Sequence, residues 1–164
     1  MKICIGCDHG GFLLKEQVKK YLENKYGQII DMGCYSEERC DYPVFAKKVA
    51  SAVQNHECDF GVLICTTGIG VSICANKFKG VRAALVTNED VASLSRNHND
   101  SNIICLGAKY TSYDEAIKYI DIFLKAMNES STLCLIFNIL NFPRNFHIII
   151  CIRINLKVLS GNSY

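Results

Sequence analysis

One ten-residue segment places a thiol and two hydroxyls beside two glycines, at a point where an apolar run gives way to a predicted helix. It reads Leu63-Ile64-Cys65-Thr66-Thr67-Gly68-Ile69-Gly70-Val71-Ser72. The first backbone N–H groups of a helix are unpaired, so they bind phosphates and oxyanions, and the same field favours the thiolate form of a nearby cysteine. The segment therefore predicts that Cys65 is a base beside an anion-binding loop, although similar turns also occur in domains that bind nothing.

Two further polar clusters lie at the ends of predicted elements. Asp8 and His9 follow an apolar run and precede two glycines, so their side chains can face a pocket. The structural alternative is that Asp8 caps the next helix and His9 is solvated. His98, flanked by two asparagines, suits proton transfer near neutral pH. A single histidine is often structural, however, and Asn99 can equally be a turn former.

The alternation of apolar runs and amphipathic stretches up to about residue 127 predicts repeated βα units. We expect strands near 2–6, 28–31, 59–64, 81–86 and 102–106, and helices near 11–25, 42–55, 69–78, 88–97 and 112–126. Five such units predict a Rossmann-like α/β/α sandwich with a five-stranded parallel sheet, whose ligands bind at the carboxyl ends of the strands. The clusters at Asp8 and Cys65 fall at such ends. His98 precedes the last strand, so it needs a turn of chain or a neighbouring subunit to reach them.

Residues 128–164 have a different character from residues 1–127. They are rich in Ile, Leu, Asn and Phe, with few charges and no βα rhythm, and 150–158 alternates like a strand. We therefore expect one α/β domain at 1–127 and an atypical apolar tail at 128–164 that is foreign to it. A frameshift, a retained intron or a wrong gene model would each give such an ending.

Composition excludes several classes of function. The chain has 18 Lys and Arg against 16 Asp and Glu, which leaves no basic field for nucleic acid. The tail has two apolar runs, at 133–142 and 147–159. Neither reaches the ~20 residues needed to span a bilayer, so no membrane association is expected. The ten cysteines follow no secretory signal, so we expect reduced thiols and a cytoplasmic location. Cys4 and Cys7 have redox-motif spacing, but buried thiols are favoured and no metal or cofactor is predicted.

Taken together, five motifs resemble the type B ribose-5-phosphate isomerase family, which also includes galactose-6-phosphate and allose-6-phosphate isomerases. They are Gly6-Cys7-Asp8-His9-Gly10-Gly11, Ser36-Glu37-Glu38-Arg39 with Asp41-Tyr42-Pro43, Leu63-Ile64-Cys65 with Thr67-Gly68-Ile69-Gly70, Ala75-Asn76-Lys77, and Ser95-Arg96-Asn97-His98-Asn99-Asp100. The resemblance covers residues 1 to about 127 in the family's order. It implies a cofactor-independent homodimer with active sites shared between subunits, which interconverts ribose 5-phosphate and ribulose 5-phosphate in the pentose phosphate pathway. Further pairing into a tetramer stays open.

The resemblance also implies a role for each matching residue. Cys65 would move a proton between C2 and C1 of the open-chain sugar, and His98 would open the furanose ring beside Tyr42. The groups that would hold the enediolate are Thr67, the amides of Gly68, Ile69 and Gly70, and Asn99. Asp8 would bind sugar hydroxyls and His9 the phosphate. Lys109 stands where the family often has a phosphate-binding Arg, and Thr66 replaces a usual Gly, which tightens the pocket.

The tail departs most from the family, because it lacks the usual Gly-Gly-Arg-His segment and further Arg that hold the phosphate. Arg144 and His147 share these residue types but not their spacing. Two alternatives therefore stand beside the pentose phosphate isomerase: a hexose-6-phosphate isomerase, and an inactive sugar-phosphate-binding protein. A nucleotide-binding protein is disfavoured, because no Gly-x-Gly-x-x-Gly follows the first strand.

Overall fold

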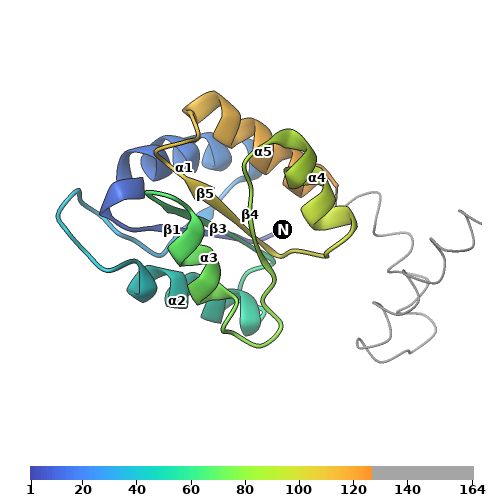
Figure 1. Ribbon diagram of the computed structural model, residues 1–164, viewed down its shortest axis with the longest axis horizontal. Helices are drawn as coiled ribbons and strands as arrows, with labels where there is room; N and C mark the ends of the chain where they lie inside the picture. The colour runs from blue at the N-terminus through green and yellow to red at the C-terminus, as the bar shows by residue number, and fades with distance from the viewer. Residues whose placement is uncertain (127–164) are drawn as a thin grey trace, which may run out of the picture. The chain divides into compact units, whose positions relative to one another are not determined.

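Five parallel strands form one sheet with the order β2-β1-β3-β5-β4 (Figure 1). The computed structural model describes residues 1–126. The strands are β1 (Ile3–Cys7), β2 (Ile29–Asp31), β3 (Phe60–Cys65), β4 (Ala83–Leu85) and β5 (Ile103–Gly107). From β1 the chain goes first to β2 on one side and then to β3 on the other. The strand order therefore reverses between β1 and β3, which is where α/β sheets of this kind bind ligands.

Helices cover both faces of the sheet (Figure 1). A 3-10 turn, η1 (His9–Gly11), leads into α1 (Phe12–Tyr26), which packs with α5 (Tyr113–Lys125) on one face. The other face carries α2 (Tyr42–Gln54) and α3 (Ile69–Ala75), which contact each other. The remaining helix, α4 (Glu89–Asn97), packs against α5.

Alternate side chains of each strand enter different cores, because successive side chains of a strand point to opposite faces. In β3, Val62 and Ile64 belong to the core beneath α1 and α5, whereas Leu63 and Cys65 belong to the core beneath α2 and α3. The thiol of Cys65 therefore lies on the side of the sheet that α3 covers.

The predicted fold class and order of elements are confirmed. The largest differences are at β4, which is shorter than expected, and at α3, which ends at Ala75 instead of near residue 78. The side-chain amide of Asn76 accounts for the early end of α3. It donates to the carbonyl of Ser72 at 3.0 Å and pairs with the backbone of Ala83 at 2.8 and 2.9 Å. The expectations for 128–164 lie outside the described residues.

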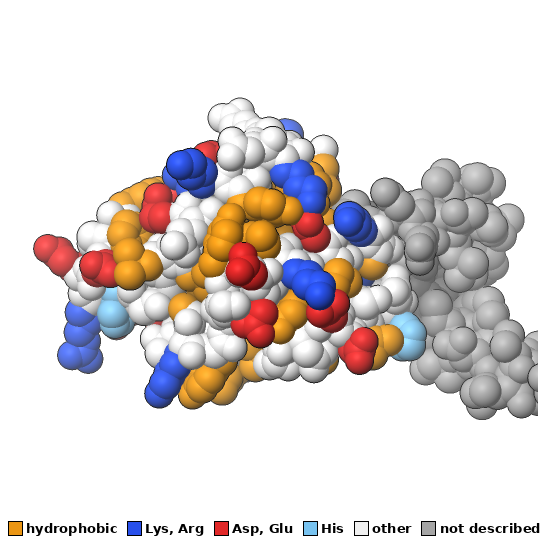
Figure 2. Space-filling view, turned by 90° about the horizontal axis from the view of Figure 1, so that it is seen from above, with side chains coloured by type: hydrophobic (Ala, Val, Ile, Leu, Met, Phe, Trp, Pro, Cys, Tyr) orange, Lys and Arg blue, Asp and Glu red, His pale blue; other side chains and the backbone are white. Residues whose placement is uncertain are grey.

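Between residues 1 and 126, no helix is long and apolar enough to cross a membrane. On the face of the molecule shown in Figure 2, acidic and basic side chains are interspersed. This mixture agrees with the near balance of 18 Lys and Arg against 16 Asp and Glu in the whole sequence.

Candidate active site

The loops that follow β1, β3 and β5 are joined by backbone hydrogen bonds. The N–H of Asp8 donates to the carbonyl of Ile64 at 3.3 Å. On the other side, the N–H groups of Ala108 and Lys109 donate to the carbonyls of Cys65 at 2.9 Å and of Thr66 at 3.1 Å. The carboxyl ends of these three strands therefore form one surface, with the loop after Cys65 at its centre.

Cys65 lies at this centre with 4% of its surface exposed. The N–H of Gly68 donates to Sγ of Cys65 at 3.0 Å. Gly68 has φ +75°, and a Cβ there would lie 2.5 Å from Cδ1 of Leu85 and 2.9 Å from the carbonyl carbon of Leu106. Only glycine fits this backbone position, so the hydrogen bond to sulfur depends on the residue type at 68. An amide donor aimed at sulfur stabilises negative charge there.

The predicted enediolate-binding groups from residues 67–70 lie in the loop that follows Cys65 and in the first turn of α3. Oγ1 of Thr67 accepts from the N–H of Ile69 at 3.3 Å. A Cβ on Gly70 would lie 2.9 Å from Cζ of Tyr42, so the absence of a side chain at 70 lets the Tyr42 ring pack against the first turn of α3. Tyr42 is 38% exposed and begins α2, so its ring lies at the edge of the loop.

Thr66 and Lys109 are exposed at the same surface. A Cβ on Gly10 would lie only 2.1 Å from Oγ1 of Thr66, so the threonine side chain fills the space above that glycine. That a side chain at 66 tightens the pocket stays a prediction. Lys109 holds its Nζ 5.8 Å from the centre of the Tyr110 ring.

Asp8 and His9 enter the same surface from β1. Oδ1 of Asp8 accepts from the N–H of Gly11 at 3.1 Å, and Asp8 is 7% exposed. The capping alternative for Asp8 therefore describes its structure, although the capped element is the 3-10 turn η1 rather than α1 itself. Nδ1 of His9 lies 3.1 Å from the carbonyl oxygen and 3.2 Å from the backbone nitrogen of Cys40. Cys40 carries no sequence signal for this role, because the contact joins segments far apart in the chain.

Sequence reasoning also missed Lys15, which is fully buried beside this surface. Its Nζ donates to Oδ2 of Asp31 at 2.8 Å and to the carbonyl of Cys34 at 3.0 Å, and it lies 2.6 Å from Oε1 of Glu16. Burial lowers the pKa of Lys15, but its hydrogen bonds to Asp31 and Glu16 outweigh burial and raise the pKa. Lys15 thereby ties the loop after β2 to α1. The available signal was its place next to Leu14 on the apolar side of the predicted helix.

His98 and Asn99 are not brought to the Cys65 surface. Both are exposed at the C-terminal end of α4, just before β5 begins. Ile103 at the start of β5 pairs with Gly61, four residues before Cys65, so the two ends of the strands are roughly 13 Å apart along the sheet. Within one chain, the predicted base lies at the C-terminal ends of the strands, and the predicted ring-opening group lies near their N-terminal ends.

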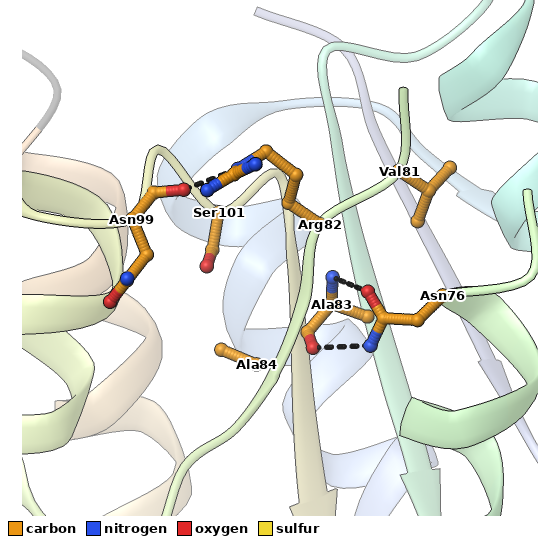
Figure 3. Close-up of a pocket in the computed structure, with 7 residues that line it drawn as sticks. All are labelled: Asn76, Val81, Arg82, Ala83, Ala84, Asn99 and Ser101. Atoms are coloured by element: carbon orange, nitrogen blue, oxygen red, sulfur yellow. Dashed lines mark hydrogen bonds between the residues drawn. The ribbon is translucent and has the colours of Figure 1, made fainter. Parts of the chain in front are cut away.

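A cavity of about 350 Å³ lies near the N-terminal ends of β4 and β5 (Figure 3). Its lining residues are Asn76, Val81, Arg82, Ala83, Ala84, Asn99 and Ser101. Asn99 is thus the one predicted site residue that lines it. No group of three His, Cys, Asp or Glu residues within 1–126 is arranged to hold a metal ion.

The fold is a doubly wound α/β domain, and a cysteine and a glycine-rich loop lie where its strand order reverses. These features define a class of α/β proteins with an anion-binding site at the carboxyl ends of the strands. The model of the Ribose/Galactose Isomerase family matches residues 3–133. The chain belongs to this family, as its motifs indicate.

Several individual proteins are similar to the chain. Ribose-5-phosphate isomerase B of Escherichia coli is 44% identical over 128 residues, which cover 78% of this chain and 86% of the relative. The structure of ribose-5-phosphate isomerase B from Clostridium thermocellum matches with a TM-score of 0.75 and 41% identity, over 84% of this chain and 98% of that one. The Mycoplasma genitalium enzyme with bound ribulose 5-phosphate matches with a TM-score of 0.71 and 38% identity, over 80% and 93%.

Proposed function

We propose that the protein interconverts ribose 5-phosphate and ribulose 5-phosphate by proton transfer through an enediolate. The observation that carries the proposal is the 3.0 Å hydrogen bond from the Gly68 N–H to Sγ of Cys65, at the strand-order reversal of this family's fold. A cysteine sulfur at the N-terminal end of a helix, with an amide donor directed at it, has the chemistry of a general base. Similarity to ribose-5-phosphate isomerase B proteins supports the choice of substrate.

In the proposed mechanism, Cys65 removes the proton from C2 of the open-chain aldose, and the C1 carbonyl oxygen gains negative charge. Reprotonation at C1 and transfer of the C2 hydroxyl proton to O1 then give the ketose, so no external oxidant or reductant is needed. The N–H of Gly68 is directed at sulfur and that of Ile69 at Thr67. The Thr67 hydroxyl and the N–H of Gly70 are therefore the groups that we assign to the developing oxyanion, whose stabilisation is usually the largest catalytic contribution.

We assign substrate binding to the groups around this centre. Asp8 would bind sugar hydroxyls, and His9 and Lys109, from the loops after β1 and β5, would bind the phosphate. Tyr42 and Thr66 would limit the volume of the pocket above the loop. The backbone hydrogen bonds that join the three loops support this assignment, because they bring the side chains to one surface.

The active site is complete only in a homodimer, in which His98 and Asn99 come from the second subunit. Both residues are exposed near the N-terminal ends of the strands, and this position supports the arrangement, because neither can reach Cys65 of its own chain. His98 would act as the acid that opens the furanose ring, and Asn99 would contact the enediolate. We place the reaction in the cytoplasm, since the eight cysteines within 1–126 are all free thiols.

The test is the rate of ribulose 5-phosphate formation by the full chain, without added metal or nucleotide. Turnover is the expected result, with ribose 5-phosphate preferred over galactose 6-phosphate at equal concentration. A preference for galactose 6-phosphate would select the hexose branch of the family. Thermal stabilisation by ribose 5-phosphate without any turnover would contradict the proposal and identify a binding protein.

A further inference from the structure

Two arginines donate hydrogen bonds to the backbone of the segment that carries His98 and Asn99. It follows α4 and contains Asp100, whose φ of +48° lies in the left-handed region. Backbone bonds close the turn, from the N–H of Asp100 to the carbonyl of Arg96 at 3.1 Å and from the N–H of Ser101 to that of Ser95 at 3.0 Å. A strained turn of this kind persists only where its surroundings hold it.

Arg96 holds the segment from beneath. It is 8% exposed, and its guanidinium carbon lies 5.2 Å from the centre of the Phe60 ring and 5.8 Å from that of Phe123. Its Nη1 donates to the carbonyl of Ser101 at 2.7 Å and to Oδ1 of Asp100 at 2.9 Å. Its Nε is buried without a hydrogen-bond partner among residues 1–126. Burying a guanidinium with an unpaired donor is costly, so packing alone does not explain an arginine here.

Arg82 holds the same segment from the side. Its Nε donates to the backbone carbonyl of Asn99, and Figure 3 shows that the side-chain amide of Asn99 points away from this contact. The backbone of Arg82 is itself fixed by Asn102, whose Oδ1 accepts from the Arg82 N–H at 2.8 Å. The two arginines thus bind the carbonyls on either side of Asp100.

We propose that Arg96 and Arg82 are positioning residues that fix the orientation of His98 and Asn99 toward the Cys65 loop of the second subunit. This inference rests on the proposed function. Neither arginine touches substrate, and each acts through the backbone of the segment. A shift of a catalytic group by about 1 Å costs about 100-fold in rate. The hydrogen bonds from Arg96 to the Ser101 carbonyl and from Arg82 to the Asn99 carbonyl therefore affect the rate of the step that His98 serves.

The experiment compares Arg82→Met, Arg82→Lys and Arg96→Lys with the unaltered chain and with His98→Asn as the reference. Arg82 is exposed, so its variants are expected to fold even if Arg96→Lys does not. Lys79→Met removes an exposed positive charge from the same connection between α3 and β4, three residues before Arg82, and serves as the matched control. Each variant is assayed on ribose 5-phosphate, which is mainly a ring, and on the aldose 5-phosphate lacking the C4 hydroxyl, which cannot form that ring.

We expect Arg82→Met and Arg96→Lys to lower kcat for ribose 5-phosphate about tenfold or more, with KM nearly unchanged, since the lost contact acts in the transition state. Like His98→Asn, they should lose less on the open-chain substrate. Arg82→Lys, which can still donate to Asn99, should recover most of the activity. Lys79→Met should match the unaltered chain.

Wild-type kcat in Arg82→Met and Arg96→Lys would overturn the inference. So would equal losses on both substrates that follow a lowered unfolding midpoint, because a merely structural role predicts that result. Failure of the proposed function gives a different outcome, in which the unaltered chain has no turnover or His98→Asn is fully active.

Discussion

The backbone N–H of Gly68 and the sulfur of Cys65 are 3.0 Å apart, so the loop that opens α3 directs a donor at the predicted base. Cys65 ends a strand buried on both faces, and Gly68 adopts a conformation that other residues reach only with strain. The same three-residue spacing that makes the turn therefore sets the environment of the thiol.

The first prediction concerns the thiol itself. Cys65→Ala should lower kcat for ribose 5-phosphate by about 10³-fold, because general base catalysis contributes about 10²–10⁴. Its unfolding midpoint and its thermal stabilisation by ribose 5-phosphate should stay near those of the unaltered chain. Cys105→Ala is the matched control, since Cys105 is a buried thiol on the same face whose pKa is raised by burial. Full activity in Cys65→Ala would remove the base from the mechanism.

The second prediction separates backbone strain from contact at Gly68. Gly68→Ala should destabilise the fold by about 3 kcal/mol, because it adds both left-handed strain and overlap with Leu85. It should also reduce kcat, since the N–H is displaced from Cys65. Gly80→Ala is the control, with φ +79° and no atom within 4 Å of the added Cβ. It should cost only about 1 kcal/mol and leave activity unchanged. Equal effects of the two changes on urea unfolding would contradict this account.

The third prediction concerns the buried ammonium of Lys15. Asp31→Asn should reduce the free energy of unfolding by about 3 kcal/mol, because it leaves a buried charge with a weaker set of partners. Lys15→Met should cost less, since it removes the buried charge and keeps the side-chain volume, while Asp31 retains Lys19 at 2.8 Å. Urea titration of both variants gives the order, and a larger loss for Lys15→Met would show that the ion pair is not the source of stability.

The fourth prediction concerns acid stability. Burial raises the pKa of Asp31, but hydrogen bonds from Lys15 and Lys19 outweigh it and lower the pKa below its ordinary value. Asp121 behaves in the same way, with Lys25 and Tyr21 as donors. The unfolded chain therefore binds more protons than the folded one in acid, so this stability is complete above about pH 5 and is lost as pH falls through 4 and below. Unfolding midpoints measured from pH 6 to 3 should fall less steeply for Asp31→Asn, and parallel curves would refute the assignment.

The sequence predicted the fold well because its periodicity is regular, with each apolar run followed by an amphipathic helix. It also placed Cys65, Thr67 and Gly68 in one loop, since these residues are local in the chain. Contacts between distant segments were not predictable. Lys15 binds the carbonyl of Cys34, and His9 contacts the backbone of Cys40, and neither pairing leaves a trace in residue spacing.

The separation of His98 from Cys65 was only partly predictable. The position of His98 before the last strand predicted that either a turn of chain or a second subunit brings it to Cys65, and the parallel register of β3 and β5 places the two residues at opposite ends of the strands within one chain. The second subunit stays a proposal. Arg96 and Arg82 were not predicted to hold this segment, because neither the burial of Arg96 nor the contact of the exposed Arg82 with Asn99 can be derived from residue spacing.

In the proposed homodimer, one active site combines Cys65 of one subunit with His98 of the other. The direct measurement is the isomerase activity of Cys65→Ala and His98→Asn chains, unfolded and refolded together in equal amounts. In a mixed dimer one site carries both changes and the other carries neither, so random pairing restores about a quarter of wild-type activity. Each variant refolded alone should stay inactive. A mixture no more active than its separate components would contradict the shared site, because two lesions in separate, self-contained sites cannot complement each other.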